Sequence, residues 1–423
     1  MKKIYFSVLT AFLLFAVQSI VAQNTVTNQI MVCSGGNFSN PDDYVTVASF
    51  KPSNGLTNSF ATVFTQSVQD VVVNGHFAFV AAQDSIVKFN IDTYERLAAV
   101  EAIGVHNLAV ADDKLIASFW YPATENFVRS FSTDDLSQLG FVSEVSDEAA
   151  GILIYKNFAY VAVPGGWSST GGKIAVIKLF GDIFIEEIDL GEDGVGVSDL
   201  FLYQANEDFL VSVNKSPWGV TVGHLSIMSL GDKQPSSFAF EASMGSGVEL
   251  FGETLYLLLD GGIGSINIPQ MAIADSLIIP NPGDGFVAAV LDTVNNLFYA
   301  TTGDYVTTGE GTIYNMEAEV TGSFDAGIAA EALAIDYRDN TGFFEKSIVE
   351  NLDVFPNPAN YRISFNIPIE QTVSKTFILD ISGRVVYSGN DHKQIDIGEL
   401  NSGLYFITIN TEVSIFTGKF IKN

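Results

Sequence analysis

The sequence has little of the chemistry on which many catalytic and nucleic-acid-binding proteins depend. It holds one cysteine and four histidines in 423 residues. This excludes a disulfide framework, and the histidines are too dispersed to indicate a clustered zinc site. Only 20 side chains are Lys or Arg against 49 Asp or Glu, so the formal net charge is -29. That balance excludes a protein that binds the phosphate backbone of nucleic acids, and it argues against docking on anionic lipid.

Motifs for a catalytic nucleophile or a bound phosphate are also missing. The sequence contains no G-x-S-x-G, no H-E-x-x-H and no glycine-rich loop between a strand and a helix. We interpret the one cysteine, Cys33, as a buried thiol in a strand. These absences favour a protein without enzymatic activity. Residues from distant segments can still assemble a site, so a hydrolase or lactonase stays an alternative.

No apolar run reaches the ~20 residues that a membrane-spanning helix needs. The longest opening run, Ile4 to Val17, follows Lys2 and Lys3 and precedes a small residue, Ala22. A basic start, a short apolar stretch and a small residue before the cut are typical of a secretory signal peptide. We predict a signal peptide over residues 1–22, cleaved near Ala22, and no transmembrane segment in the mature protein; the alternative is a membrane anchor.

Apolar residues make up 47% of the chain, and they recur in a pattern. Each copy has an apolar strand, a polar turn, a strand that ends in small residues, a loop and two more strands. Copies begin at residues 69, 106, 150, 198, 246 and 287, with a further start at 331. Four short strands in a unit of 37 to 48 residues are typical of propeller blades. The short β-branched and aromatic runs argue against helical repeats of the same period.

Six copies are complete and the seventh is split. The start at 331 offers one strand, over residues 331–336, and residues 28–64 offer three strands without an opening one. We therefore predict an all-β chain with a seven-bladed β-propeller over residues 23–337, whose closing blade joins N- and C-terminal segments. Such pairing removes two open sheet edges. An open sandwich, or six or eight blades, are the alternatives.

Several repeats resemble the YVTN-type surface propellers. The residues that carry the likeness are Phe79-Val80-Ala81 with Ile86 to Thr93, and Tyr160-Val161-Ala162 with Gly172 to Ile177. The literal tetrapeptide is missing and several loops are longer. The resemblance covers about residues 28–340 and implies a fold, but it implies no particular function because one fold hosts many activities.

The character of the chain changes after the propeller repeats. Residues 338–351 are polar and turn-prone, and we interpret them as a linker. Residues 352–423 carry 7 acidic and 6 basic side chains, so the acidity belongs to the propeller. Short alternating strands with regular turns predict a small Ig-like β-sandwich in this tail.

The tail also resembles the type IX secretion C-terminal sorting domain (type A) of Bacteroidetes. Four segments match in order: Val354 to Ala359, Asp380 to Arg384, Leu400 to Tyr405, and Lys419 to Asn423. The residues that we assign to the sorting signal are Pro356, Asn357, Pro358, Gly383, Arg384, Gly403, Tyr405, Lys419 and Lys422. The resemblance implies passage through the periplasm, the type IX secretion machinery as a partner, and a secreted or cell-surface location. An ordinary Ig-like adhesive module is the alternative.

All three tryptophans occupy the same place in the repeat. Trp120, Trp167 and Trp218 each follow the second strand of their copy, and in an antiparallel blade these loops lie on one face. Tyr121 lies beside the first of them, and Tyr305 occupies a comparable loop. Indoles have broad apolar faces with one donor, which suits sugars and other flat ligands. We predict a ligand-binding rim; loop anchors packed on neighbouring blades are the alternative.

The starts of the inner strands are expected on the same face, around the central channel. They supply Asp70, His106, Asp199 and Glu331. Polar groups that converge at a channel mouth predict a small-ligand or cation site. Loops rich in Asp and Gly could bind a calcium ion through their oxygen atoms, although the preference of these residues for tight turns explains the loops better. We expect no other metal and no cofactor.

These patterns predict an exported binding propeller that holds a small molecule, a glycan or a protein on the face with the tryptophans. A propeller hydrolase or lactonase with its site at the channel mouth is one alternative, and a non-catalytic surface scaffold is the other.

Overall fold

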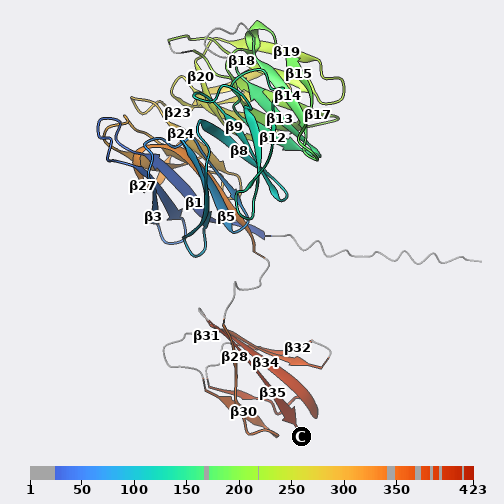
Figure 1. The fold of residues 1–423 in the computed structure, drawn as a ribbon. Coiled ribbons are helices and arrows are strands. Elements are labelled where there is room, and N and C mark those ends of the chain that lie inside the picture. The colour runs from blue at the N-terminus through green and yellow to red at the C-terminus, as the bar shows by residue number, and fades with distance from the viewer. Residues whose placement is uncertain are drawn as a thin grey trace, which may run out of the picture. The chain divides into compact units, whose positions relative to one another are not determined.

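The computed structural model describes residues 24–165, 171–217, 219–340, 348–366, 373–381, 384–389, 393–411 and 414–423. The predicted signal peptide lies outside these residues. The chain divides into two compact units after Asp339, both made of strands (Figure 1). The predicted all-β class is therefore confirmed.

Five antiparallel four-stranded sheets form most of the first unit. The first sheet is β4 (Asp70–Asn74), β5 (Phe77–Ala82), β6 (Ser85–Asn90) and β7 (Glu95–Glu101). The second is β8 (Val105–Ala111), β9 (Lys114–Phe119), β10 (Val128–Ser132) and β11 (Gln138–Val142). The third is β12 (Ile152–Tyr155), β13 (Phe158–Val163), β14 (Lys173–Lys178) and β15 (Ile183–Asp189). The fourth is β16 (Val197–Gln204), β17 (Asp208–Asn214), β18 (Gly223–Ser229) and β19 (Pro235–Phe240). The fifth is β20 (Met244–Phe251), β21 (Thr254–Leu259), β22 (Gly262–Asn267) and β23 (Ala272–Ile279).

A seven-stranded sheet contains both ends of the first unit. Its order is β24 (Ala288–Asp292), β25 (Leu297–Thr301), β26 (Thr308–Asn315), β27 (Val320–Asn340), β1 (Asn24–Gly35), β2 (Val45–Lys51) and β3 (Leu56–Val63). The long strand β27 pairs with β26 through its first part and includes the predicted inner segment 331–336. Four-stranded sheets of this kind are consistent with a propeller-like fold. The number of blades and the manner of closure stay predictions.

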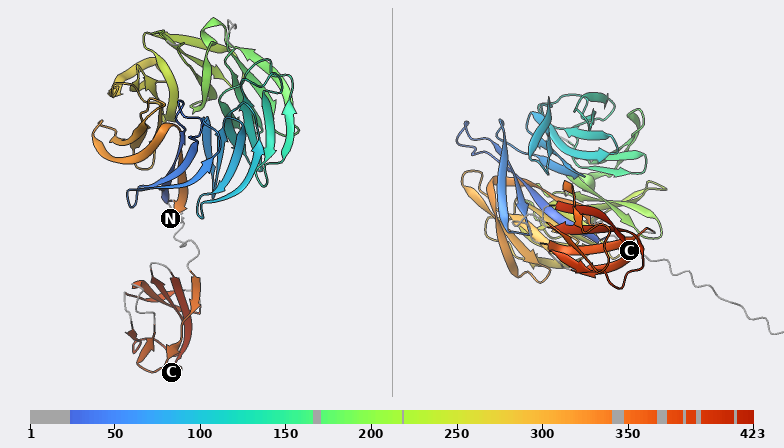
Figure 2. Two further views of the ribbon diagram at one scale, coloured as in Figure 1. Left: turned by 60° about the vertical axis from the view of Figure 1, so that its left-hand side comes forward. Right: turned by 90° about the horizontal axis from the view of Figure 1, so that it is seen from below.

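The first strands of the sheets face the middle of this unit. Each contacts the first strand of the next sheet: β4 with β8, β8 with β12, β12 with β16, β16 with β20, and β20 with β24. Figure 2 (left) shows the sheets following one another in chain order, from blue to orange. Apolar clusters fill the space between consecutive sheets, such as Phe79 and Ile86 packed with Leu115 and Phe119. The inner strand starts therefore gather around one axis, as the repeat pattern predicts.

The second unit is a two-layer β structure. One sheet has the order β28 (Ile348–Asn351), β35 (Ser414–Lys422), β34 (Gly403–Thr411), β31 (Val373–Asp380) and β32 (Val385–Gly389). The other has β29 (Val354–Phe355), β30 (Arg362–Phe365) and β33 (Gln394–Asp396). Ile363 and Phe365 of the smaller sheet share a buried core with Ile378, Ile407 and Phe416 of the larger one. This arrangement agrees with the small sandwich that the sequence predicts.

Both ends of the predicted linker form strands. Residues 338–340 complete β27, and residues 348–351 form β28, which pairs in parallel with β35. The sequence pattern missed these strands because both are short extensions rich in polar residues, without the apolar alternation that marks a strand.

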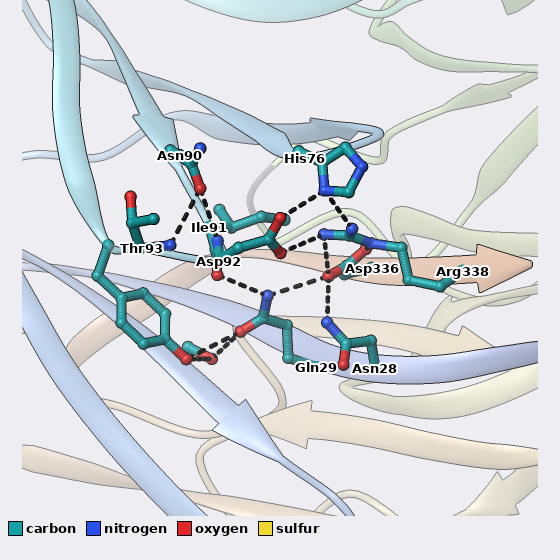
Figure 3. A network of polar contacts seen from close by, with 11 residues as sticks. Asn28, Gln29, His76, Asn90, Ile91, Asp92, Thr93, Asp336 and Arg338 are labelled. Carbon is teal, nitrogen blue, oxygen red and sulfur yellow. Dashed lines mark hydrogen bonds and ion pairs between the residues drawn. The ribbon is translucent and has the colours of Figure 1, made fainter. Parts of the chain in front are cut away.

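A polar network joins the two ends of the first unit to its first sheet (Figure 3). The guanidinium of Arg338 donates to the carboxylates of Asp336 and Asp92, at 2.9 Å in each case. The fully buried Asp336 also accepts from the amides of Asn28 (2.8 Å) and Gln29 (3.0 Å), both on β1. Gln29 donates further to the Ile91 carbonyl, at 3.0 Å. One buried carboxylate therefore ties β27 to β1, and through Arg338 to the loop after β6.

Replacing Arg338 by alanine leaves Asp336 buried without its cation. We expect a loss of about 3 kcal/mol in the free energy of unfolding of the first unit, because an unpaired buried charge is costly. Urea titration monitored by tryptophan fluorescence measures it, since the three tryptophans lie at positions 120, 167 and 218. The control is Lys156→Gln at the exposed pair with Asp208, where we expect a much smaller loss because solvent screens the pair. Equal effects of the two variants would contradict the role given to the network.

Candidate ligand-binding site

A cavity of about 520 Å³ lies where the inner strands begin. Its lining brings together five of the residues that the sequence assigns to a site: Asp70, His106, Trp120, Asp199 and Glu331. They come from four different sheets, because each occupies the start of an inner strand or, for Trp120, the loop after a second strand. We call this cavity the channel mouth. Its remaining lining mixes small apolar residues, such as Gly247 and Ala288, with polar ones, such as Ser198 and Ser246.

The Trp120 loop is held close to the preceding inner strand. The Trp120 amide donates to the Gly104 carbonyl at 2.7 Å, and the Ala123 amide donates to the Trp120 carbonyl at 2.9 Å. Gly104 has a φ of +80°, and a β-carbon there would lie 2.3 Å from the Trp120 carbonyl oxygen. Only glycine fits this approach. The turn thus fixes the indole at the edge of the mouth, where 37% of the residue remains exposed.

His106, near the start of the inner strand β8, stacks on the indole. Its ring stacks on Trp120 with 4.2 Å between centroids and 15° between planes. Its Nδ1 donates to the Asn107 side-chain oxygen at 2.6 Å. Burial lowers the pKa of the imidazole to about 4, and the nearby Lys215 ammonium acts in the same direction. The ring is therefore neutral at pH 7 and offers Nε2 as an acceptor.

Asp70 and Asp199 each tie one inner strand to the next. The Asp70 carboxylate accepts from the Leu108 amide at 2.8 Å, and Asp199 accepts from the Gly247 amide at 3.0 Å. Burial raises the pKa of Asp70 to about 6. Ser198 also donates to Asp199, at 2.8 Å. These two carboxylates therefore hold neighbouring sheets together as well as lining the mouth.

The sequence analysis missed Lys215, which also lines the mouth. It directly follows β17, the same repeat position as Trp120 after β9, so its place in the repeat was a usable signal. No hydrogen bond or ion pair of its ammonium occurs among the described residues, yet its charge acts on His106 and Glu331. The mouth thus combines three carboxylates with one cation that is free to meet a ligand.

A second cavity, of about 490 Å³, adjoins the first. Tyr305 and Phe38 line it, and it shares Gln69 and Glu331 with the channel mouth. The Tyr305 hydroxyl donates to a Glu331 carboxylate oxygen at 2.6 Å. Burial raises the pKa of Glu331. The ring of Phe38 is 84% exposed beside them, so this side of the mouth carries an accessible aromatic face.

The other predicted rim residues are not all placed. Tyr121 follows Trp120 and is 82% exposed, outside the lining of either cavity. Trp167 and Trp218 lie outside the described residues, so their predicted positions stay predictions. Within the described ranges, no three His, Cys, Asp or Glu side chains gather in a way that could hold a metal ion.

Several of the predicted sorting residues lie on or beside β34 and β35 of the second unit. Asn357, between Pro356 and Pro358, donates to the Lys419 carbonyl (3.1 Å) and accepts from the Ile421 amide (2.9 Å). This bidentate contact docks the segment onto β35.

Two further sorting positions, Gly403 and Tyr405, lie on β34. Gly403 pairs with Lys422, and the buried Tyr405 donates to the Asn401 carbonyl at 2.9 Å. Of the two terminal lysines, only Lys419 is exposed; Lys422 is largely buried and donates to the Asn423 carbonyl. Arg384 is exposed beside Asp380, and Gly383 lies outside the described residues.

Comparison with known proteins identifies the tail. Residues 353–423 match the family of the secretion system C-terminal sorting domain. This confirms the predicted sorting domain and implies export by the type IX secretion system, to the cell surface or into the medium. No curated protein has a matching sequence. In the described part of the chain, no helix has the length and hydropathy needed to cross a membrane.

Several solved structures are similar to the chain. A functionally unknown protein from Desulfotomaculum acetoxidans has a TM-score of 0.55 at 14% identity, over 73% of this chain and 99% of that one. Apo AztD from Citrobacter koseri has a TM-score of 0.50 at 10% identity, over 74% and 99%. PorZ, a surface component of the type IX secretion system of Porphyromonas gingivalis, has a TM-score of 0.46 at 12% identity, over 94% of this chain; the chain spans 58% of that protein. At such identities the likeness concerns the fold alone.

The pKa of His106 makes a prediction about stability. Its folded value of about 4 lies below the ordinary 6.5, so its contribution is present above pH 6.5 and lost as the pH falls toward 4. Relative to His106→Asn, the wild type should lose about 2 to 3 kcal/mol of unfolding free energy between pH 7 and pH 4. The raised pKa of Asp70 changes the stability with pH in the opposite direction. Because Asp70 is present in both proteins, its effect cancels in the comparison. Urea titrations at the two pH values measure the difference, and an unchanged difference would contradict the burial of the ring.

Proposed function

We propose that this protein is an exported binding protein, a seven-bladed propeller that holds a small hydroxyl-rich ligand, such as one sugar unit of a glycan, at its channel mouth. The observation that carries the proposal is the cavity of about 520 Å³ that joins an indole, three carboxylates and the ammonium of Lys215. Ligand sites are concave, few, and contain a small number of convergent polar groups.

The packing between sheets supports the seven-bladed ring. Among the described residues of the first unit there are seven apolar clusters, the number of consecutive blade pairs in a closed ring of seven. Met31, Val47 and Ala332 share a cluster with Val80 and Val87 of the first sheet. Ile30 and Phe50 share another with Tyr299 and Phe324. The segment that contains β1 and β2 therefore packs on sheets from both ends of the repeat array.

The polar groups at the mouth suit hydroxyl groups of a ligand. The described hydrogen bonds use one oxygen of Glu331 and one of Asp199, which leaves the other oxygen of each as an acceptor. Lys215 adds a charged donor, which has no partner among the residues that the structure describes. A sugar hydroxyl both donates and accepts, and the apolar face of a sugar ring stacks on an indole. Trp120 offers that platform at the edge of the mouth.

The export route supports a role outside the cell. The sorting domain over residues 353–423 directs secretion, and we add the predicted signal peptide over residues 1–22 and a bacterial source among the Bacteroidetes. The mature propeller is then displayed on the surface or released. A hydrolase is favoured by no observation at the mouth, because His106 Nδ1 faces the Asn107 amide oxygen and not a carboxylate. A scaffold is disfavoured by the concave shape of the site.

Trp120→Ala should weaken the binding of the best sugar ligand at least about tenfold, because it removes the stacking platform. Lys215→Gln should weaken it less, since it removes a single charged donor. Screening a panel of monosaccharides and short glycans against the wild type identifies the ligand, and calorimetry then measures its affinity for each variant. Phe180→Ala is the control, because this aromatic side chain is 78% exposed outside the cavity. Sugars that bind Trp120→Ala as tightly as the wild type would contradict the site.

Deleting residues 352–423 should leave the propeller in the periplasm, because the sorting domain is the part that matches a secretion signal. Cell fractionation with an antibody to the propeller measures its location. The control is Arg384→Gln, which removes an exposed charge at a predicted sorting position and should reduce export less than the deletion. Unchanged export of the truncated chain would refute this route.

A further inference from the structure

A cavity of about 610 Å³ lies at the opposite end of the strands from the channel mouth. It opens between the sheet β12–β15 and the sheet β16–β19. Its lining comes from the end of β12, the start of β13, the turn before β17 and the end of β18 with the segment after it. In an antiparallel sheet these positions are one strand length away from the inner strand starts. We call it the inter-sheet pocket; nothing in the proposed function uses it.

The floor of the inter-sheet pocket is aromatic. Phe158 and Tyr160 line it, 6.4 Å apart between ring centroids, and both belong to the apolar cluster between the two sheets. Tyr160 is only 4% exposed, and its hydroxyl has no hydrogen bond among the described residues. This hydroxyl is not one of the buried polar atoms that lack a partner, so it reaches the open space of the pocket. Its place in the lining of a cavity makes it available to a ligand.

The rim of the pocket is acidic. Glu207, Asp208 and Asp232 line it against a single cation, Lys156. The Asp208 carboxylate is oriented by the Tyr155 hydroxyl and by the Gln204 amide, which donates at 3.0 Å. Because three carboxylates outnumber one ammonium, and the whole protein has a net charge of -29, the rim attracts cations and repels anions.

Lys156 shows what the rim accommodates. Its ammonium lies 3.3 Å from an Asp208 oxygen and 4.5 Å from the centroid of the Tyr155 ring. A carboxylate beside the face of an aromatic ring is a recurring arrangement for an alkylammonium group. The Lys156 side chain is itself 69% exposed, so it occupies the edge of the pocket and leaves the floor open.

We propose that the inter-sheet pocket is a second binding site, and that it takes an organic cation: a primary ammonium or guanidinium group carried on an apolar or aromatic body. The body lies on Phe158 and Tyr160, and the cationic head faces Glu207 and Asp232. The Tyr160 hydroxyl accepts from the ligand. This site is independent of the channel mouth, so a failure of either proposal leaves the other intact.

Three probes with one ring and different heads test the proposal: benzylamine, benzyl alcohol and benzoate, titrated into the full chain by NMR or calorimetry. Benzylamine should bind at least about fivefold more tightly than benzyl alcohol, and its affinity should fall with added salt. Benzoate should show no binding. Equal affinity for the amine and the alcohol would overturn the proposal, because the pocket would then recognise only the ring.

Four charge-removing variants locate the binding. Glu207→Gln and Asp232→Asn keep the acceptors that Ser229 and the Gln234 amide use, and should each weaken benzylamine two- to fivefold. Lys156→Gln removes the resident cation and should strengthen it by a similar factor. Asp112→Asn, at the turn between β8 and β9, makes the same charge change outside the pocket and should have no effect. Weakening by Lys156→Gln, or equal weakening by Asp112→Asn, would overturn the proposal.

Discussion

The pairing of β27 with both β26 and β1 is the constraint on which the first unit depends. Without it the chain would end in two unpaired strand edges, which are templates for aggregation. The buried Asp336 makes the pairing specific, because the amides of Asn28 and Gln29 and the guanidinium of Arg338 all converge on it. The same strand carries Glu331 into the channel mouth. The pairing of the two ends of the first unit and the position of Glu331 in the site therefore depend on one contact between distant segments.

The sequence predicts the repeated sheets well because the residues of each repeat indicate its strands and turns locally. Apolar alternation and small turn residues are local signals, so the five four-stranded sheets follow from them. The contact between β1 and β27 could not be predicted in this way. Asn28 and Asp336 are 308 residues apart, and neither belongs to a motif, so no local pattern reveals their hydrogen bond. The polar strand ends at residues 338–340 and 348–351 were assigned to a linker for the same reason.

The position of the site was more predictable than the hydrogen bonds that its residues make. Repeat register alone brings Asp70, His106 and Asp199 to one cavity. It does not reveal that the two carboxylates accept backbone amides of the next sheet, since that depends on distances between strands. It also passed over Lys215, whose repeat position matches that of Trp120. A register argument that included every side chain after a second strand, and not the aromatic ones alone, would have found it.

We propose that this exported protein meets its ligands at the cavities on the two ends of its strands. The channel mouth among them depends on β1 lying beside β27, the strand that carries Glu331. A double-mutant cycle of Gln29→Ala and Asp336→Ala, with unfolding free energies from urea titration, tests that contact directly. The account predicts a coupling of at least about 1 kcal/mol, as expected for a buried hydrogen bond to a charged group. Additive effects of the two substitutions would contradict it.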